Sequence, residues 1–404
     1  MTYDFDKAID RHGTYSMKYD DDGYFHAMSS DIYLDKNTLR LMIADTDFQC
    51  APAITKAMHR VADFPTFGYT TAEAAPEYKD SIISWYQRRF GYEIKPEWII
   101  HASGALDGVG QTIKAFSNPG DGVIICCPVY SNFTSTIHRL HRKVVNCQLV
   151  GGENGNYRMN WENFEKTCAD EKNKVYVLCS PENPIGRVWT KDELQKMAEI
   201  CRTHNVVLVS DEIHCDIVRK GVHHLPILKA VEDHSNLIMV SGVNKSFNLM
   251  GLQCAYTVIP DDKLREAYSK DYYPEPPTPF AIAGVIAAYN ESEDWLDSLN
   301  QYIDEAFVSV AAYFKKKLPK VKVYVPEGTY TMWVDFTEYG YSQNILQYLV
   351  NHKANVCVQG GTSHDPQNGD HFLRFAIACP KAKIFEAIDR IAAAFDEYEK
   401  SEER

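Results

Sequence analysis

The feature that most constrains the fold is an alternation, through the middle of the chain, of short β-branched runs with longer amphipathic stretches. Seven runs have the character of strands: Trp98–His101, Val123–Cys127, Val144–Leu149, Lys174–Cys179, Val206–Ser210, Leu237–Ser241 and Cys254–Ile259. Three intervening stretches have apolar residues at helical spacing: Leu106–Phe116, Lys191–His204 and Asp262–Asp271. This pattern predicts an α/β fold, with a large domain built on a mostly parallel seven-stranded sheet flanked by helices.

A proline-rich stretch, Tyr273–Pro279, interrupts this alternation. A long helical region is expected after it, from Phe280 to about Lys316. The remainder has four strand-like runs and a closing helix: Lys322–Val325, Tyr330–Phe336, Val356–Gln359, Phe372–Ile377, and Lys381 to about Tyr398. We therefore expect a large domain over residues 51–285 and a smaller α+β domain over 286–404, with residues 1–50 as an N-terminal segment that packs with the small domain.

Charge and cysteine content restrict the partners and the compartment. The 404 residues include 42 Lys and Arg against 55 Asp and Glu, a net charge of −13. An acidic surface of this size repels nucleic acid and anionic lipid, so neither is an expected partner. The densest apolar stretch, Val123–Tyr130, is far shorter than the ~20 residues that cross a bilayer, and no signal peptide is visible at the start. The odd number of cysteines, eleven, without zinc-ribbon spacing, favours free thiols in a reducing cytoplasm and no metal site.

Three polar residues stand where predicted strands end. Asn183 follows the strand Lys174–Cys179, Asp211 closes Val206–Ser210, and Lys245 follows Leu237–Ser241. Ligands of open parallel sheets bind outside the carboxyl ends of the strands, so these side chains are expected to converge on one crevice.

Two further segments fit the same edge. The segment HASGALDGVG, residues 101–110, leaves a strand and opens a helix near Leu106, so free N–H groups at the helix start can receive a phosphate. Tyr130, in CPVYSNF, also comes just after a strand.

These are the parts that pyridoxal phosphate requires. A lysine bonds the cofactor covalently and moves a proton at the substrate Cα. An acid keeps the ring nitrogen protonated, an amide contacts the ring oxygen, an aromatic side chain covers the ring, and a helix start takes the phosphate.

Each part also has an ordinary structural interpretation. A loop lysine is usually solvated, an Asp at a strand end is usually a turn or helix cap, and Asn-Pro followed by Gly is a common turn. A tyrosine such as Tyr130 is most often a packed interface aromatic. Their occurrence in order at one sheet edge favours the functional interpretation.

At these residues the sequence resembles the fold-type I pyridoxal phosphate enzymes of the class I/II aminotransferase superfamily, and within it the MalY/PatB-type carbon–sulfur β-lyases, which are cystathionine β-lyase-like. The resemblance runs over nearly all the chain. It includes FDKAIDRHGTYSMKY from residue 5, IADTDFQCAP from 43, FGYT from 67, CPVYSNF from 127, CSPENPIGRVWTKDEL from 179, SDEIHCDIV from 210, NKSFNLMGLQ from 244, EGTYTMWVDF from 327 and FLRFAIACP from 372.

The resemblance implies a role for each cofactor-binding position. Lys245 would be the Schiff-base lysine, Asp211 the partner of the pyridine nitrogen, Asn183 the contact of the ring hydroxyl, and Tyr130 the stacked aromatic. The backbone N–H groups expected at the phosphate are those of three successive residues, Gly104, Ala105 and Leu106.

The other implied roles concern the substrate and a second subunit. Arg374 would bind the substrate α-carboxylate, with Tyr130, Asn183 and Ala44 also at the substrate. Tyr69 would reach the phosphate of the neighbouring subunit's cofactor, which implies a homodimer. His214 and Ser241 complete the expected cofactor contacts, although a core histidine is about as common an outcome for His214.

Two positions favour a lyase over an aminotransferase. Gln253 stands where many aminotransferases have a phosphate-binding arginine, and His214 replaces the tyrosine of their DExY motif. The chain also departs from the pattern. Gly242 and Asn244 replace two hydroxyl residues before the lysine, so Ser241 is the remaining candidate for a hydroxyl at the phosphate. The segment QGGTSHDPQNGDHF, residues 359–372, lacks the usual aromatic after its glycines.

Three functions follow from this sequence. The leading hypothesis is β-elimination of L-cystathionine or a related cysteine-S-conjugate to thiol, pyruvate and ammonia. The alternative is an aminotransferase of an L-amino acid that uses the same residues. Binding of a transcriptional regulator, without catalysis, is the third and is least favoured, because every catalytic part is intact.

Overall fold

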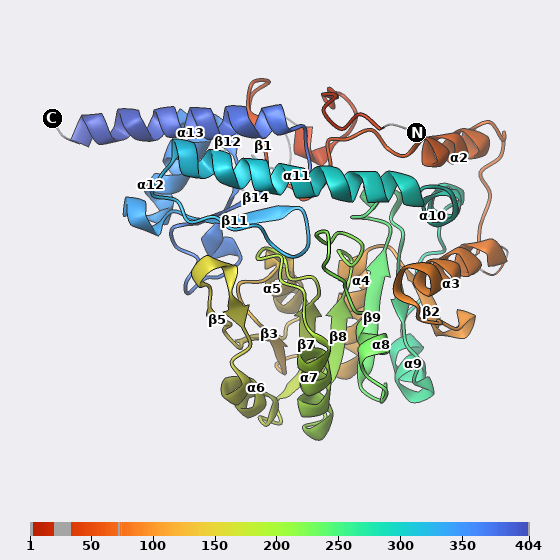
Figure 1. Cartoon of the computed structure of the whole chain (residues 1–404). Coiled ribbons are helices and arrows are strands. Elements are labelled where there is room, and N and C mark those ends of the chain that lie inside the picture. Colours follow the sequence, from red (N-terminus) through yellow and green to blue (C-terminus); the bar gives the residue numbers. More distant parts are fainter. Residues whose placement is uncertain (1–2, 20–33, 72, 74, 403–404) are drawn as a thin grey trace.

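The centre of the protein is a seven-stranded sheet, seen in a computed structural model that describes residues 3–19, 34–71, 73 and 75–402 (Figure 1). In spatial order its strands are β2 (Ile99–Ala102), β10 (Ala255–Val258), β9 (Leu237–Gly242), β8 (Val207–Asp211), β7 (Asn173–Cys179), β3 (Gly122–Ile125) and β4 (Lys143–Asn146). Strand β10 is antiparallel to both of its neighbours, β2 and β9, and the four pairings among the remaining strands are parallel. The seven predicted strands and the mostly parallel sheet are therefore confirmed.

Helices cover both faces of this sheet, which is why its strands are apolar on both sides. One face packs against α4 (Ala105–Phe116), α5 (Ser131–Arg139) and α9 (Asp262–Ser269), and receives Val175 and Val177 of β7. The other face packs against α6 (Trp161–Cys168) and α7 (Lys191–Thr203), and receives Tyr176 and Leu178. Residues along one strand thus alternate between two cores.

A smaller unit forms from the C-terminal part and the N-terminal segment. Its three antiparallel strands are β11 (Thr331–Asp335), β14 (Phe372–Ala376) and β13 (Gln359–Gly360). Beside them β1 (Leu39–Arg40) pairs in parallel with β12 (Val356–Cys357), so the N-terminal segment joins this region. The long helix α13 (Lys381–Glu402) lies against α11 (Glu293–Lys317). Residues 20–33 of the predicted N-terminal segment lie outside the described residues.

The predicted long helical region from Phe280 to about Lys316 is confirmed, and it is divided. Two helices occupy this stretch, α10 (Pro279–Glu291) and α11, and Ser292 separates them. Ser292 has φ −128° and ψ 17°, outside the helical region, and its hydroxyl donates to the carbonyl of Ala287 at 2.9 Å. Serine competes in this way for backbone acceptors, and this ends helices without any proline or glycine.

Two predicted strands of the small domain also differ. Lys322–Val325 is not a strand, because only Lys322 pairs with β11, through two hydrogen bonds to Asp335, before the chain leaves the sheet toward Pro326. The run Val356–Gln359 is divided between β12 and β13, which belong to different sheets. Strand pairing depends on partners distant in sequence, which these local patterns do not contain.

Two general properties of the described residues bear on the sequence expectations. All eleven cysteines are free; ten are buried and Cys50 is partly buried. No helix among the described residues combines the length and the apolar character needed to cross a membrane.

Candidate active site

Lys245 lies in the loop after β9, partly buried. Its Nζ donates to the carbonyl oxygen of Ala44 at 2.6 Å and lies 3.1 Å from Sδ of Met250. Burial, with the Arg374 charge acting in the same direction, lowers the pKa of Lys245 to about 8, although Asp45 and Asp211 oppose the shift. A lysine amine in this state is neutral in an appreciable fraction near neutral pH, as a nucleophile or proton acceptor must be.

Asp211 is the last residue of β8 and is 4% exposed. It lies between Cys179 of β7 and Val240 of β9, so it stands at the carboxyl edge of the central strands. Its Oδ1 accepts a hydrogen bond from the N–H of Ile213 at 3.1 Å. Burial raises the pKa of Asp211 to about 7, although the Ile213 N–H and Lys245 act in the opposite direction. A buried carboxyl of this kind would ionise fully once a cationic ring nitrogen came against it.

Arg374, in β14 of the small domain, reaches the same edge. Its Nη1 lies 3.5 Å from Oδ1 of Asn183, and its Nη2 donates to the carbonyl of Met42. The guanidinium is 2% exposed, its Nε has no hydrogen-bond partner, and none of the ion pairs among the described residues includes it. Burial lowers the pKa of Arg374 to about 10. A buried guanidinium without a carboxylate is stabilised by an incoming one.

Tyr130 immediately precedes α5 and packs edge-on against Phe133, with ring centroids 5.6 Å apart. Its hydroxyl accepts a hydrogen bond from Nδ2 of Asn132 at 2.8 Å. The preceding residue, Val129, is held by His364 of the small domain: its N–H donates to the His364 carbonyl and its carbonyl accepts from His364 Nδ1, both at 3.1 Å.

The helix start expected to bind phosphate is present. Gly104 is the N-cap of α4, and the helix begins at Ala105, so the N–H groups of Ala105 and Leu106 have no partner within the helix. A Cβ placed on Gly104 would meet nothing within 4 Å. Open space therefore adjoins these donors, as an anion site needs.

Three predicted residues lie in other surroundings. The Ser241 hydroxyl is buried and donates to the carbonyl of Glu212 at 3.2 Å, so it already has a protein partner. His214 is buried edge-on against Tyr330, and Nδ1 of His214 has no partner. Burial, with the charges of Lys245 and Arg374, holds the pKa of His214 well below its ordinary value. The Tyr69 side chain is fully exposed.

Sequence reasoning missed several groups that surround the site. The Tyr330 hydroxyl donates to the Ala44 carbonyl at 3.0 Å, so this oxygen accepts from both Tyr330 and Lys245. Tyr330 lies in the motif EGTYTMWVDF, which could have singled it out. The carbonyl of Met42 could not have been found in this way. Every residue has a backbone carbonyl, and the sequence does not show which of them points toward the site.

A second charged cluster lies beside the site, and we call it the N-terminal charge network: Arg11, Lys18, Asp45, Asp47 and Lys383. Asp47 receives Arg11 at 2.8 Å, Lys18 at 3.0 Å and Lys383 at 2.8 Å. Asp45 pairs with Arg11 at 2.8 Å and with Lys18 at 3.2 Å. Although burial opposes it, the charges of Lys18, Lys383 and Arg11 hold the pKa of Asp47 well below its usual range.

The residues of the site fit pyridoxal phosphate. Asp211 is a buried carboxyl that lacks a cation in direct contact, Lys245 supplies the amine, and Asn183 supplies an amide. Unpaired N–H groups beside open space suit the phosphate, and Arg374 suits a carboxylate on the substrate. Together these groups can bind an anionic amino acid, hold its carboxylate and accept a proton from its Cα.

Comparison with known proteins agrees with this geometry. The chain is 33% identical to cystathionine β-lyase PatB of Bacillus subtilis over 96% of this chain and 99% of that protein. It is 29% identical to the protein MalY of Escherichia coli over 95% and 96% of the two chains. The PLP-bound C–S lyase from Staphylococcus hominis, complexed with L-cycloserine, superposes with a TM-score of 0.91 at 29% identity, covering 98% of each chain.

The family assignment follows from these likenesses and from one more match. The family model described as aminotransferase class I and II matches residues 36–391, nearly the whole chain. The sequence-based assignment to the superfamily and the likeness to its MalY/PatB-type members are both confirmed. The chain belongs to the aminotransferase class I and II family.

Proposed function

We propose that this protein is a pyridoxal phosphate-dependent carbon–sulfur β-lyase that cleaves L-cystathionine or a related cysteine-S-conjugate to a thiol, pyruvate and ammonia. The observation that carries the proposal is the meeting of Lys245, Asp211, Asn183 and the carboxylate-free Arg374 at one sheet edge. The likeness to a cystathionine β-lyase over nearly the full length supports the same reaction.

Each residue has a defined task in this reaction. The cofactor, when bound, supplies an electron-withdrawing ring next to the substrate Cα. Arg374 and Asn183 hold the substrate α-carboxylate, and Arg374 does so with two parallel N–H donors. Lys245 takes the Cα proton as a neutral amine, which its lowered pKa of about 8 favours. Asp211 would hold the ring nitrogen of the bound cofactor and keep it protonated.

The step after proton removal separates lyase from aminotransferase. In elimination the Cβ–S bond breaks, the sulfur leaves with the electron pair and takes up a proton, and the three-carbon fragment hydrolyses to pyruvate and ammonia. In transamination Lys245 would move the same proton, but the substrate would keep its sulfur. Gln253 in place of the arginine and His214 in place of the tyrosine of the aminotransferase pattern support elimination.

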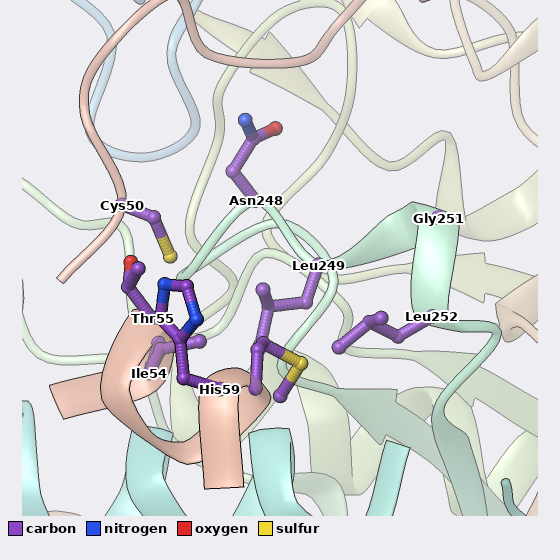
Figure 2. A pocket seen from close by; sticks show the side chains of 9 residues that line it. Cys50, Ile54, Thr55, His59, Asn248, Leu249, Gly251 and Leu252 are labelled. Atoms are coloured by element: carbon purple, nitrogen blue, oxygen red, sulfur yellow. The ribbon is translucent and has the colours of Figure 1, made fainter. Parts of the chain in front are cut away.

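We further propose that the protein is a homodimer in the cytoplasm, and that Tyr69 of each subunit completes the active site of the other. Large aromatic side chains are exposed near Tyr69, among them Phe64 and Phe67, each 63% exposed. Nearby, an apolar cavity of about 310 Å³ opens between α2 (Pro52–Ala62) and the loop after Lys245, where Figure 2 shows Ile54 and His59 facing Leu249 and Leu252. A second subunit would cover such a surface. The eleven free thiols support a reducing compartment.

The reaction is tested by product analysis. The purified protein is incubated with L-cystathionine alone and, separately, with an amino donor plus 2-oxoglutarate. Pyruvate and a thiol formed without a keto acid support the proposal, and a Lys245→Ala variant should form neither. Glutamate formation that depends on 2-oxoglutarate, without thiol release from cystathionine, would overturn it in favour of the aminotransferase.

The dimer is tested by complementation. Tyr69→Phe and Lys245→Ala variants are each mixed with themselves and with each other after reversible dissociation. If Tyr69 acts across the interface, the mixed dimer regains one intact site and part of the activity. A monomer in sedimentation analysis, or no recovery in a proven mixed dimer, would contradict this arrangement.

A further inference from the structure

A second cavity has the character of an anion site, and we propose that it binds a small molecule bearing phosphate groups. It has a volume of about 810 Å³ and lies where the end of α3 (Pro76–Phe90), the start of α7, residues 215–225 and α11 meet. We call it the cationic cavity, after the six basic side chains that line it: Arg88, Arg89, Lys191, Arg219, Lys220 and Lys229.

Positive charge in this cavity exceeds the neighbouring negative charge. Its lining includes two carboxylates, Asp216 and Glu293, and two more, Asp297 and Asp304, pair with its arginines from outside. None of the ion pairs of residues 3–19, 34–71, 73 and 75–402 includes Lys191, Lys220 or Lys229, all three of which are exposed. Six cations against four carboxylates is unusual in a chain with a net charge of −13.

Arg219 adds a buried donor to these exposed charges. Its side chain is 8% exposed and packs over the ring of Phe307, 4.7 Å from the ring centroid. Nε lies 3.2 Å from Asp304 and Nη2 donates to the carbonyl of Thr329 at 2.9 Å, whereas Nη1 has no hydrogen-bond partner. Burial lowers the pKa of Arg219 to about 10. Arg219 is one of the residues that line the cavity, and an unpaired buried guanidinium N–H is stabilised when an acceptor reaches it.

The charge comes from side chains and not from the start of α7. Thr190 caps that helix, and Glu193 accepts from the Thr190 N–H at 3.0 Å and from its hydroxyl at 2.9 Å, so the helix start is already occupied by a carboxylate of the chain. A ligand would therefore be held by the lysines at the rim and by Arg219 at the wall.

The dimensions and the lining indicate the class of ligand. A volume of about 810 Å³ lies in the range of small-molecule sites, about 300–1,000 Å³. Phe90 and Trp189 contribute aromatic surface beside the cations. Several separate cations with fixed arginine geometry suit a multiply charged phosphate compound better than a single carboxylate. Asp216, in the lining, accepts hydrogen bonds from Trp85 Nε1 at 3.1 Å and from the Ser246 hydroxyl at 2.8 Å, so this carboxylate already has donors of its own.

The test is calorimetric titration of the protein with tripolyphosphate at constant ionic strength. Borohydride reduction beforehand fixes any bound cofactor, so that the probe cannot displace it. We expect saturable binding with one site per chain. Lys191→Gln/Lys220→Gln/Lys229→Gln should weaken it at least tenfold. The matched control is Lys143→Gln/Lys172→Gln/Lys263→Gln, which removes three other exposed lysines and should change the affinity less than twofold.

Two results would overturn the proposal: no saturable binding by the native protein, or equal weakening in both triple variants, which would mean attraction to general surface charge. Equal melting temperatures of the two triple variants establish that both fold. Arg219→Lys supplies a second check, since it keeps the charge but cannot place Nη1, and we expect several-fold weaker binding. None of these readouts is catalytic, so they stand apart from the test of the lyase activity.

Discussion

Two clusters of buried charge lie next to each other in this protein, and they differ in how completely they are paired. In the N-terminal charge network Asp47 alone receives three cations and the hydroxyl of Tyr19, which donates at 2.9 Å. At the active site the charges of Asp211 and Arg374 both act on Lys245, yet no ion pair joins these three residues within the described chain.

The difference shows in the direction of the pKa shifts. The pKa of Asp47 is held below its usual range and that of Asp211 is raised to about 7, although both carboxyls are buried. Cations in direct contact account for the first shift and desolvation without them for the second. A network with its own counterions stabilises the fold, whereas a cluster without them is stabilised by a ligand. The following predictions test this distinction.

Lys245→Ala should have the largest effect. Losing both the covalent attachment and the proton acceptor should lower lyase activity about 10³-fold or more, since a positioned acid–base group alone contributes about 10²–10⁴. Lys143→Ala, at an exposed position, is the control. In the native protein, mass mapping after borohydride reduction should place the cofactor adduct on Lys245. An adduct on another lysine would refute the assignment.

Asp47→Asn should instead act on stability. Removing one partner of a buried ion-pair network costs about 3–5 kcal/mol, measured as the free energy of unfolding in urea. Folding lowers the pKa of Asp47, so its carboxylate stabilises the fold at pH values above the ordinary carboxyl pKa. This stabilisation is lost as the pH falls through the lowered pKa. Asp80→Asn, on the exposed side of α3, is the control. A change below about 1 kcal/mol would show that the network contributes little.

Asp211→Asn should raise the free energy of unfolding of the cofactor-free protein, whereas Asp47→Asn should lower the free energy of unfolding. Turnover should fall on the order of 10²–10³-fold, because the charge that stabilises the ring cation is lost. The cofactor-free protein should become more stable at pH 8. The raised pKa of about 7 means that the native protein without cofactor loses stability as the pH rises from about 4 to 7, and asparagine removes that loss. Equal unfolding free energies of variant and native protein at pH 8 would contradict the inference.

Arg374→Lys should affect the substrate and not the cofactor. Lysine keeps the charge but loses the two parallel donors, a cost of about 2–3 kcal/mol, or roughly 30- to 150-fold in kcat/KM. The cofactor absorption before substrate addition should not change. The control is Arg390→Lys on α13, where the arginine pairs with Glu386 and donates to the carbonyl of Asn37, away from the substrate. A lower melting temperature with an unaltered KM would mean that the arginine is structural.

His364→Phe should have the smallest effect. It removes a hydrogen bond to Val129 and one to Gln359, at about 1 kcal/mol each, while a planar and somewhat larger aromatic ring stays at that position. We expect KM to rise up to about tenfold with kcat nearly constant, because Tyr130 is then less firmly placed. His364→Asn should recover part of the affinity, and the exposed His138→Phe should change neither parameter. An effect on kcat alone would argue against a positioning role.

The sequence predicts one half of the candidate site much better than the other. Asn183, Asp211 and Lys245 lie at or just after the ends of apolar runs that are typical of buried strands, and parallel strands end at a common edge, so local pattern indicates where they lie. Arg374 was singled out by the family resemblance, and its place within an apolar run agrees, because a buried arginine needs an anion. These predictions use properties that the side chains themselves reveal.

The remainder depends on contacts between distant segments. The pairing of β1 with β12, the bonds from His364 to Val129 and the occupied hydroxyl of Ser241 all join residues that no local pattern connects. The break at Ser292 was missed for a different reason, since a single serine hydroxyl decided between a continuous helix and two helices. Likewise, the roles of Tyr69 and His214 require a bound cofactor or a second subunit to become visible.

The carbonyl groups of Met42 and Ala44 have a consequence for evolution. They accept hydrogen bonds from Arg374 and Lys245, and every amino acid carries the same carbonyl. Mutations can therefore alter the side chains at both positions without removing either acceptor, as long as the backbone keeps its path. At these two positions natural selection would act on the backbone conformation and only indirectly on which amino acid is present. Family members that differ at these two positions can thus share the same contacts, and an inhibitor that bonds to these carbonyls would leave few routes to resistance by substitution.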